Sequence, residues 1–435
     1  MILVGVWKTT GNEYSSEEDF LHSLAELEEL AKACRMDPLE TITQQLPGVD
    51  KALYVRSGKA EEIAAVTEAL GAERVIFNDT LTPSQIRNLQ KLLKVPVTDR
   101  TRLILEIFER RARTREAKLQ VELAKLRYLK PRLIGMWETQ NRQGGASGSM
   151  SAKGEGETQL EIDRRTIDHR LSELRRDLKE VSSERETQRK QRRNSHLPLV
   201  ALVGYTNAGK STIMNAMIDS WSRETSSEDK KVFEADMLFA TLDTTVRKIS
   251  VEQGREFLLS DTVGFINRLP ASLVEAFQST LEEVTEADLL LQIVDSSDEH
   301  CHDHIRVTRE TVASLGAGRI PMVTVFNKCD LSASAGKYPR RGLRESSIDG
   351  ERNENIYISA KEPSSIDLLT RVIIEKLESR NVTRDYLVPY HKGNVQSFLM
   401  EHARVISIDY LDEGASMTVS CEKAVADRAE KMLSQ

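Results

Sequence analysis

The chain has 435 residues, of which 39% are hydrophobic and 30% are charged, and its 61 basic and 68 acidic residues give a formal net charge of −7. This composition argues against a wholly disordered chain, and the length predicts two to four domains. No apolar run approaches the roughly 20 residues that span a bilayer, no signal-peptide pattern is present and the four cysteines form no CxxC pair, so we expect a cytoplasmic protein with neither a zinc site nor a disulfide framework.

Residues 1–100 alternate short apolar runs with helical patterns. Pro83 directly after Thr82 is a helix start signal. Strands separated by helices predict βαβ units and a parallel sheet. The expected strands are residues 2–7, 52–56, 74–78 and 95–98, and the expected helices are 17–33, 59–69 and 82–93.

Residues 101–194 differ in character. Leucines recur at helical spacing from Leu119 to Leu129, and a heptad seam of apolar residues runs from Leu160 to Val181. Pro131 is predicted to end the first helical region. Residues 143–156 are too rich in Gly and Ser to be helical. The pattern predicts a long antiparallel helical hairpin with a glycine-rich loop at its tip.

The hairpin region also carries the positive charge of the chain. Residues 101–200 hold 23 Lys and Arg against 15 Asp and Glu, a net +8, which leaves −15 for the rest of the chain. Such a block indicates a polyanionic partner. The alternative is a solvated helical face rich in Arg–Glu pairs, which is the more common meaning of an isolated charge run.

Residues 195–380 return to an α/β pattern, and residues 381–435 predict a small α+β module. Buried strands are expected over residues 199–203, 257–260, 289–294, 322–326 and 355–358, while the polar insert 222–231 is expected to be a loop. In the last segment, residues 405–410 and 416–420 predict a hairpin that turns at 412–414 and is followed by a helix.

The strongest chemical signal is a phosphate-binding loop after the strand at 199–203 and before the helix at 212–218. Gly204 and Gly209 let the backbone wrap closely around phosphates, so that N–H groups and the helix N-terminus face the anion. Lys210 is predicted to reach the β and γ phosphates, and Ser211 to bind Mg²⁺. The motif reads Gly204-Tyr205-Thr206-Asn207-Ala208-Gly209-Lys210-Ser211, with Thr212 next to it.

Four further motifs stand in the order that a GTPase needs. Asp261-Thr262-Val263-Gly264 offers a carboxylate that contacts Mg²⁺ through water and an N–H that senses the γ-phosphate. Asn327-Lys328-Cys329-Asp330 offers a carboxylate for guanine N1 and N2, a donor pair that adenine lacks. Ser359-Ala360-Lys361 offers a backbone contact to guanine O6. Phe239-Ala240-Thr241-Leu242-Asp243 lies where switch I belongs, and Thr241 is expected to bind Mg²⁺ in the triphosphate state.

These motifs predict a Mg²⁺-dependent enzyme that converts GTP to GDP and phosphate, with Lys210, Thr241 and Gly264 as its catalytic residues. Phe265 stands where Ras-like enzymes place a water-orienting Gln, so hydrolysis must use another group or a partner that remodels the site. Asn207 is typical of GTPases that use K⁺ in place of an arginine finger. The alternative, to which we give equal weight, is that Asn207 only shapes the loop.

Together with these motifs, two further segments make the sequence resemble the HflX family, in the Obg–HflX branch of translation-associated GTPases. They are residues 99–133 (DRTRLILEIFERRARTREAKLQVELAKLRYLKPRL) and 156–165 (GETQLEIDRR). The resemblance covers nearly the whole chain and implies binding to the large ribosomal subunit and its RNA, and splitting of stalled or idle ribosomes into subunits. We expect a monomer. The predicted fold class is α/β, with an N-terminal parallel-sheet α/β domain (1–100), a long antiparallel helical hairpin (101–194), a P-loop GTPase domain (195–380) and a small α+β C-terminal domain (381–435).

The sequence departs from the family pattern at three places. Residues 153–157 read KGEGE where the family usually has an RGPGE-like loop, Thr244 replaces a common Pro, and Arg56-Ser57-Gly58-Lys59 lacks the first glycine of a G-x-G-K pattern, so we assign no second nucleotide site there. Two other functions stay open: a nucleotide-gated RNA-binding or ribosome-assembly factor without splitting activity, and a metabolic ATPase, against which Asn327–Asp330 argues.

Overall fold

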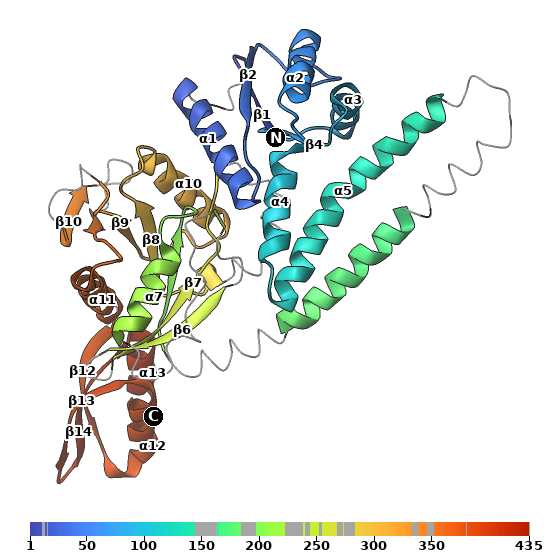
Figure 1. Cartoon of the computed structure of the whole chain (residues 1–435). Coiled ribbons are helices and arrows are strands. Elements are labelled where there is room, and N and C mark those ends of the chain that lie inside the picture. Colours follow the sequence, from blue (N-terminus) through green and yellow to red (C-terminus); the bar gives the residue numbers. More distant parts are fainter. Residues whose placement is uncertain are drawn as a thin grey trace.

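The computed structural model forms four parts along the chain: an N-terminal sheet, a helical arm, a central sheet and a small C-terminal sheet (Figure 1). The structure describes residues 1–10, 14, 16–143, 162, 164–183, 197–221, 238–239, 244–251, 255–267, 273, 283–332, 338–345, 352–379 and 381–434. The expected switch I residues 240–243, the insert 222–231 and the hairpin tip 144–156 lie outside the described residues.

The N-terminal part is a four-stranded parallel sheet with the strand order β2-β1-β3-β4, as the βαβ pattern predicts. The predicted helices are confirmed. One of them begins with a capping box in which Thr82 and Gln85 satisfy each other's backbone N–H groups, and Pro83 is its first residue. The elements are β1 (Ile2–Lys8), α1 (Glu17–Ala33), β2 (Glu40–Leu46), α2 (Ser57–Ala69), β3 (Val75–Phe77), α3 (Pro83–Leu93) and β4 (Val97–Asp99).

The strand predicted at residues 52–56 is wrong, and the second strand of the sheet is β2, further upstream. Asp50 and Tyr54 instead close a turn through two backbone hydrogen bonds, and the Asp50 carboxylate accepts two N–H groups inside that turn. A side chain that caps its own following N–H groups favours a turn over a strand. The only buried side chains of β2 are Ile42 and Leu46, and its other residues are polar. Its strand conformation therefore depends on hydrogen bonds to β1 and not on a hydrophobic pattern of its own.

The helical arm follows β4. It consists of α4 (Arg100–Arg111), α5 (Arg115–Gln143) and a helix over residues 164–183 that lies antiparallel to α5 (Figure 1). Leu123, Leu171 and Leu174 form the buried centre of the contact, so the predicted hairpin seam is confirmed. The prediction that Pro131 ends the first helix is wrong, since α5 continues through it. A proline removes one helical hydrogen bond, and α5, which is 29 residues long, continues despite that loss.

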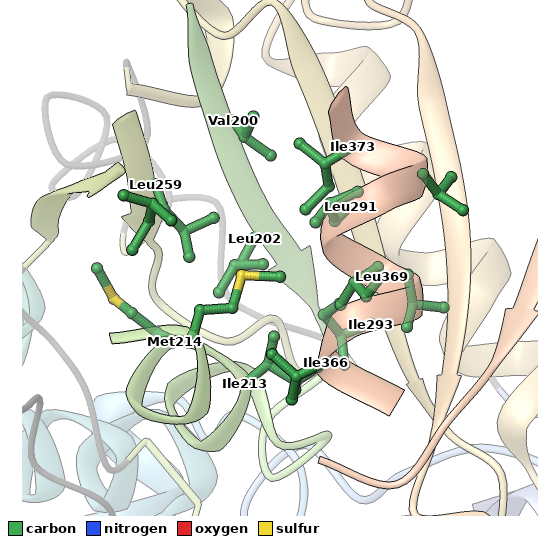
Figure 2. Packing of buried hydrophobic residues seen from close by; sticks show 14 of the residues in the cluster. Val200, Leu202, Ile213, Met214, Leu259, Leu291, Ile293, Ile366, Leu369 and Ile373 are labelled. Carbon is green, nitrogen blue, oxygen red and sulfur yellow. The ribbon is translucent and has the colours of Figure 1, made fainter. Parts of the chain in front are cut away.

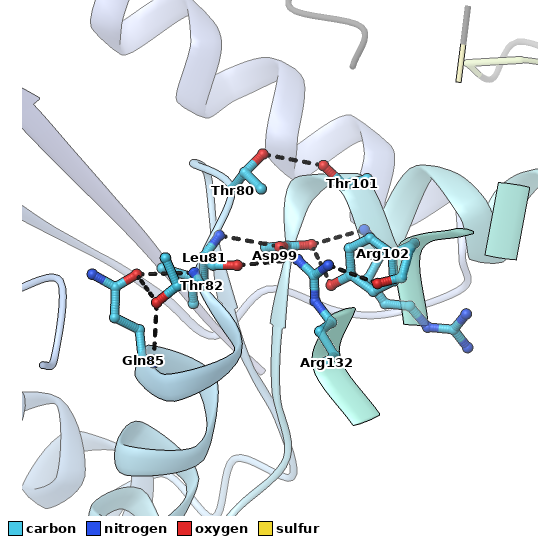
Figure 3. Close-up of polar contacts among 9 residues, drawn as sticks. Thr80, Leu81, Thr82, Gln85, Asp99, Thr101, Arg102 and Arg132 are labelled. Carbon is cyan, nitrogen blue, oxygen red and sulfur yellow. Dashed lines mark hydrogen bonds and ion pairs between the residues drawn. The ribbon is translucent and has the colours of Figure 1, made fainter. Parts of the chain in front are cut away.

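Asp99 anchors the arm on the N-terminal sheet. Its fully buried carboxylate accepts hydrogen bonds from the backbone N–H groups of Leu81 (3.1 Å) and Arg102 (2.9 Å), as Figure 3 shows. It also accepts the Tyr128 hydroxyl (2.8 Å) and the Arg132 guanidinium (2.9 Å) of α5. A carboxylate has about four lone-pair sites, so this buried charge is fully satisfied. Burial, together with the Asp99 charge, raises the pKa of Tyr128 far above its usual value, which keeps the phenol a donor.

The central part is a seven-stranded sheet with the order β10-β11-β9-β8-β5-β7-β6, in which only the two edge strands run antiparallel to their neighbours. The five predicted strands are confirmed, whereas the polar edge strands β6 and β10 were not predicted. α7 and α11 cover one face of the sheet (Figure 2). The elements are β5 (Leu199–Gly204), α7 (Lys210–Trp221), β6 (Thr245–Ser250), β7 (Glu256–Asp261), β8 (Leu289–Asp295), α10 (Cys301–Ser314), β9 (Met322–Asn327), β10 (Arg340–Glu345), β11 (Arg352–Tyr357) and α11 (Pro363–Glu378).

The C-terminal part is a three-stranded antiparallel sheet with the order β12-β14-β13, packed against two helices. The predicted hairpin and final helix are confirmed, while β12 was not predicted. None of the helices in the described residues is long and apolar enough to cross a membrane. The elements are β12 (Asn381–Val388), the 3₁₀ turn η4 (Tyr390–Lys392), α12 (Gly393–His402), β13 (Arg404–Leu411), β14 (Gly414–Glu422) and α13 (Lys423–Ser434).

Candidate functional site

Four of the five predicted motifs meet at one edge of the central sheet. β5, β7, β9 and β11 all run parallel, and each is followed by one of these motifs. The carboxyl ends of parallel strands face the same way, so the motifs converge there.

The phosphate loop forms the turn between β5 and α7, and it needs its two glycines. Gly204 has a φ of 151° and Gly209 a φ of 92°, both in the range that side chains disfavour. A Cβ at Gly204 would lie 2.3 Å from the Ile293 carbonyl oxygen, and one at Gly209 would lie 2.3 Å from Nδ2 of Asn327. Asn207 is also left-handed at a φ of 60°, which asparagine tolerates better than most residues.

Lys210 is the first residue of α7 and is almost completely buried at 7% exposure. Its ammonium donates to the carbonyl oxygens of Gly204 (3.1 Å) and Tyr205 (2.7 Å), so the side chain lies back across the loop. Burial lowers the pKa of Lys210 to about 8, and the charge of Asp261 acts in the opposite direction. A buried ammonium at a helix N-terminus offers positive charge where backbone N–H groups also point.

The end of β7 is joined to the phosphate loop at two points. The Ser211 hydroxyl donates to Oδ2 of the fully buried Asp261 at 2.7 Å. Backbone hydrogen bonds also link Thr206 N–H to the Phe265 carbonyl (2.8 Å) and Phe265 N–H to the Gly204 carbonyl (3.0 Å). A hydroxyl beside a carboxylate is a hard oxygen donor set of the kind that suits Mg²⁺, so these residues fit the predicted metal.

The segment after Asp261 explains two sequence features. A Cβ on Gly264 would lie 2.8 Å from Thr206 Cα and 3.0 Å from Lys210 Nζ, so only glycine allows this close approach to the loop. The Phe265 side chain is 3% exposed and packs in a core with Val203 and other apolar residues beneath the loop. A ring held in that core cannot orient an attacking water.

The predicted guanine motifs are joined to the phosphate loop by Asn327. Its Nδ2 donates to the Ala208 carbonyl (3.0 Å), and its Oδ1 accepts the Ala360 N–H (3.0 Å). The Asp330 carboxylate is partly exposed and lies 3.8 Å from the ammonium of Lys361. Asn327 thus connects three of the predicted motifs through backbone atoms.

The structure brings most of the predicted site together. Residues 204–212, 261–264, 327–330 and 359–361 are adjacent, whereas Thr241 with residues 240, 242 and 243 lies outside the described part of the chain. Phe239 is described, and its ring packs edge-on against Phe108 of α4 with centroids 4.8 Å apart. Its side chain therefore belongs to the core shared with the arm.

Sequence reasoning missed the contacts between the phosphate loop and the N-terminal part. The Tyr205 hydroxyl donates to the Glu26 carboxylate of α1 and accepts the Asn267 N–H at 2.6 Å. Arg100 forms an ion pair with Glu26 and donates to the Asn267 carbonyl at 3.3 Å. These groups are buried, and burial with the Glu26 charge raises the pKa of Tyr205 well above its usual value. A glutamate on an amphipathic helix gives no local signal of such a role.

Comparison with known proteins agrees with this geometry. Three family models match in order: GTP-binding GTPase N-terminal (residues 21–109), GTP-binding GTPase Middle Region (111–192) and 50S ribosome-binding GTPase (199–328). GTPase HflX of Caldanaerobacter subterraneus subsp. tengcongensis is 41% identical over 410 residues, which cover 94% of this chain and 90% of that protein. The chain belongs to the HflX family of GTPases.

Further HflX relatives show the same extent of similarity. GTPase HflX of Lacrimispora saccharolytica is 39% identical, and the match covers 95% of this chain and 91% of that protein. GTPase HflX of Escherichia coli K12 is 36% identical, and the match covers 95% of this chain and 92% of that protein. The resemblance inferred from the sequence, the α/β fold class with a P-loop GTPase domain, and GTP hydrolysis as the activity are thereby confirmed. This HflX GTPase carries a domain of the ribosome-binding GTPase family.

Proposed function

We propose that this HflX GTPase binds the large ribosomal subunit and separates stalled or idle ribosomes into subunits, in a Mg²⁺-dependent cycle of GTP binding and hydrolysis. The observation that carries the proposal is a basic helical arm that is joined, through buried polar contacts, to the loop expected to bind phosphate.

The charge of the arm supports an RNA partner. The described arm residues 115–143 and 164–183 hold 13 Lys and Arg against 7 Asp and Glu. Ion pairs such as Arg170–Glu122 and Lys130–Asp168 cross between its helices and neutralise part of this charge. The Arg–Glu pairing considered from the sequence is therefore present, but a positive excess remains. Basic side chains gain affinity for RNA by releasing counterions from its phosphates.

The connection from arm to nucleotide supports coupling between them. Asp99 joins α5 to the N-terminal sheet, and Glu26 of that part bonds to Tyr205 in the phosphate loop. Both links depend on a buried carboxylate, so we expect a displacement of the arm to reach the loop. Because Phe265 is held in the core, we expect slow hydrolysis in isolation and strong stimulation by the large subunit.

The proposed roles at the nucleotide follow from the same contacts. Lys210 and the loop N–H groups stabilise phosphate charge, Asp330 selects guanine, and Asn327 holds the two loops at a fixed separation. Ser211 and Thr241 would hold Mg²⁺, with Asp261 contacting it through water. Mg²⁺, when bound, neutralises charge on the β and γ phosphates. We leave K⁺ at Asn207 as a proposal to be tested, since the left-handed backbone there also favours the loop-shaping role.

Density-gradient profiles of ribosomes test the proposed activity. Wild-type protein with GTP should convert intact ribosomes into free subunits, whereas an assembly or docking factor would bind without releasing them. Deleting residues 143–156 should impair splitting far more than basal GTP turnover. Splitting that survives the deletion, or turnover that the large subunit does not increase, would contradict the proposal.

A matched pair of charge variants tests the arm directly. Arg175→Glu with Lys179→Glu reverses two exposed charges on the arm, and Arg371→Glu with Lys431→Glu reverses two exposed charges on α11 and α13. Only the arm variant should lose affinity for the large subunit and show a shallower salt dependence. Equal losses in both variants would mean that total charge, and not the arm, determines binding.

A further inference from the structure

Histidines from two parts of the chain meet beside the phosphate loop. His22 lies on α1, and Asp298, His300 and His304 lie in the segment that leads from β8 into α10, which faces α1 (Figure 1). His22, Asp298 and His304 each present one ligand atom, and these atoms all lie within 4.8 Å of one another. The ring centroid of His22 lies 4.0 Å from that of His300 and 5.5 Å from that of His304.

His304 is held in place while one of its ring nitrogens, the buried Nε2, has no hydrogen-bond partner among the described residues. It is 7% exposed, and its ring stacks on Tyr205 with centroids 3.8 Å apart. Its Nδ1 lies 3.7 Å from Oδ2 of Asp298, which is beyond hydrogen-bond length. Nδ1 is therefore the nitrogen that faces Asp298, and no hydrogen bond between described residues holds it there.

The surrounding groups prepare His304 and Asp298 to bind a cation. The ring of His304 is already fixed by its stack on Tyr205, so little ordering of this side chain is needed to bind an ion. Asp298 accepts the His300 N–H at its Oδ1 (2.8 Å), an interaction that fixes the carboxylate while Oδ2 faces His304.

We propose that His22, Asp298 and His304 form a site for Zn²⁺ or a similar divalent transition-metal ion, which would clamp the N-terminal part onto the GTPase domain. Imidazole nitrogen with carboxylate oxygen is a donor set that Zn²⁺ accepts. Two ligands of a tetrahedral Zn²⁺ lie roughly 3.4 Å apart, so side-chain movements of about an ångström close the site. Water or His300 fills the remaining position. The set contains no cysteine, which is why cysteine spacing alone led us to expect no zinc site.

The proposed metal site lies next to the phosphate loop, and Tyr205 of that loop contacts residues on both sides. His22 and Glu26 are four residues apart and therefore share one face of α1. His22 faces the metal site while Glu26 bonds to Tyr205, whose ring in turn covers His304. A bound ion would thus fix α1 against the phosphate loop.

The test uses the full-length protein, stripped by a chelator and kept free of nucleotide. Co²⁺ serves as a probe with visible absorption bands, and Zn²⁺ is added in competition. We expect one ion per chain. His22→Ala and Asp298→Asn should each raise the Zn²⁺ Kd by about tenfold or more, because even groups that only support a ligand change metal affinity by that factor.

His302→Ala is the matched control. His302 belongs to the same short tract but is exposed and lies outside the cluster, so its loss should leave the Zn²⁺ Kd unchanged. Asp298→Asn retains an oxygen for the His300 N–H, so a loss shared with His22→Ala cannot come from damage to one loop. Absence of a saturable Co²⁺ spectrum, or equal Zn²⁺ affinity in the wild type and both ligand variants, would overturn the proposal.

Discussion

Lys210 should make nucleotide binding depend on pH in a range where an ordinary lysine does not titrate. In the free protein, burial lowers its pKa to about 8 while it donates to two loop carbonyls. Bound phosphates place negative charge beside the ammonium and raise that pKa again. Binding above pH 8 must therefore take up a proton, and affinity should fall as pH rises.

The magnitude follows from the protonated fraction of the free site. With a pKa of about 8, the fraction is about 0.9 at pH 7 and about 0.25 at pH 8.5, so affinity for GDP should fall about fourfold. The stability of the nucleotide-free protein should change in the opposite sense. Its folded-state pKa lies below the unfolded value of 10.5, so the unfolded chain binds more protons between about pH 8 and 10.5, and the free energy of unfolding rises with pH in that window.

Titration with a fluorescent GDP analogue between pH 7 and 8.5 measures the effect. Lys210→Arg is the control, since arginine keeps its charge throughout this range. Protons that the nucleotide itself gains or loses in this pH range affect both proteins alike, so comparing the variant with the wild type removes their contribution. We expect the wild-type affinity to decline relative to that of the variant. Parallel curves for the two proteins would refute the reasoning, because they would show that Lys210 stays charged in the free site.

Three further outcomes follow from the site. Asp330→Asn should weaken GTP binding at least tenfold and relax the preference over ATP, because a charged acceptor contributes about 1.5–3 kcal/mol per hydrogen bond; an unchanged preference in competition assays would disprove the guanine assignment. Asn327→Ala removes the bonds to Ala208 and Ala360 and should lower the free energy of unfolding by about 1–3 kcal/mol in denaturant titrations, with weaker GDP binding; wild-type values for both would show that the bridge is dispensable. If Asn207 binds a monovalent ion, turnover should be faster in K⁺ than in matched Na⁺, and equal rates leave it only its role in the loop.

The nucleotide chemistry could be predicted from the sequence because it depends on local patterns. Gly204 and Gly209 stand where the backbone must turn and where no Cβ fits, and such positions are readable without knowing the rest of the fold. The same is true of α3, whose start is determined by Thr82 and its neighbours, and of the leucine seam of the hairpin. In each case the residues that decide the structure lie within a few turns of one another.

Only the tertiary structure decided features that depend on distant residues. β2, β6 and β10 are polar strands at the edges of their sheets, so their conformation comes from hydrogen bonds to a neighbouring strand and not from their own hydrophobic pattern. α5 passes through Pro131, although a proline in a helix interior removes one backbone hydrogen bond and by itself predicts a helix end. The contact between Glu26 and Tyr205 joins residues 179 positions apart, and the metal-binding cluster joins His22 to Asp298 and His304, which lie more than 270 positions further along the chain. No periodic pattern in the sequence predicts such pairs, because these contacts form, and stabilise the protein, only when the N-terminal part and the GTPase domain are packed together.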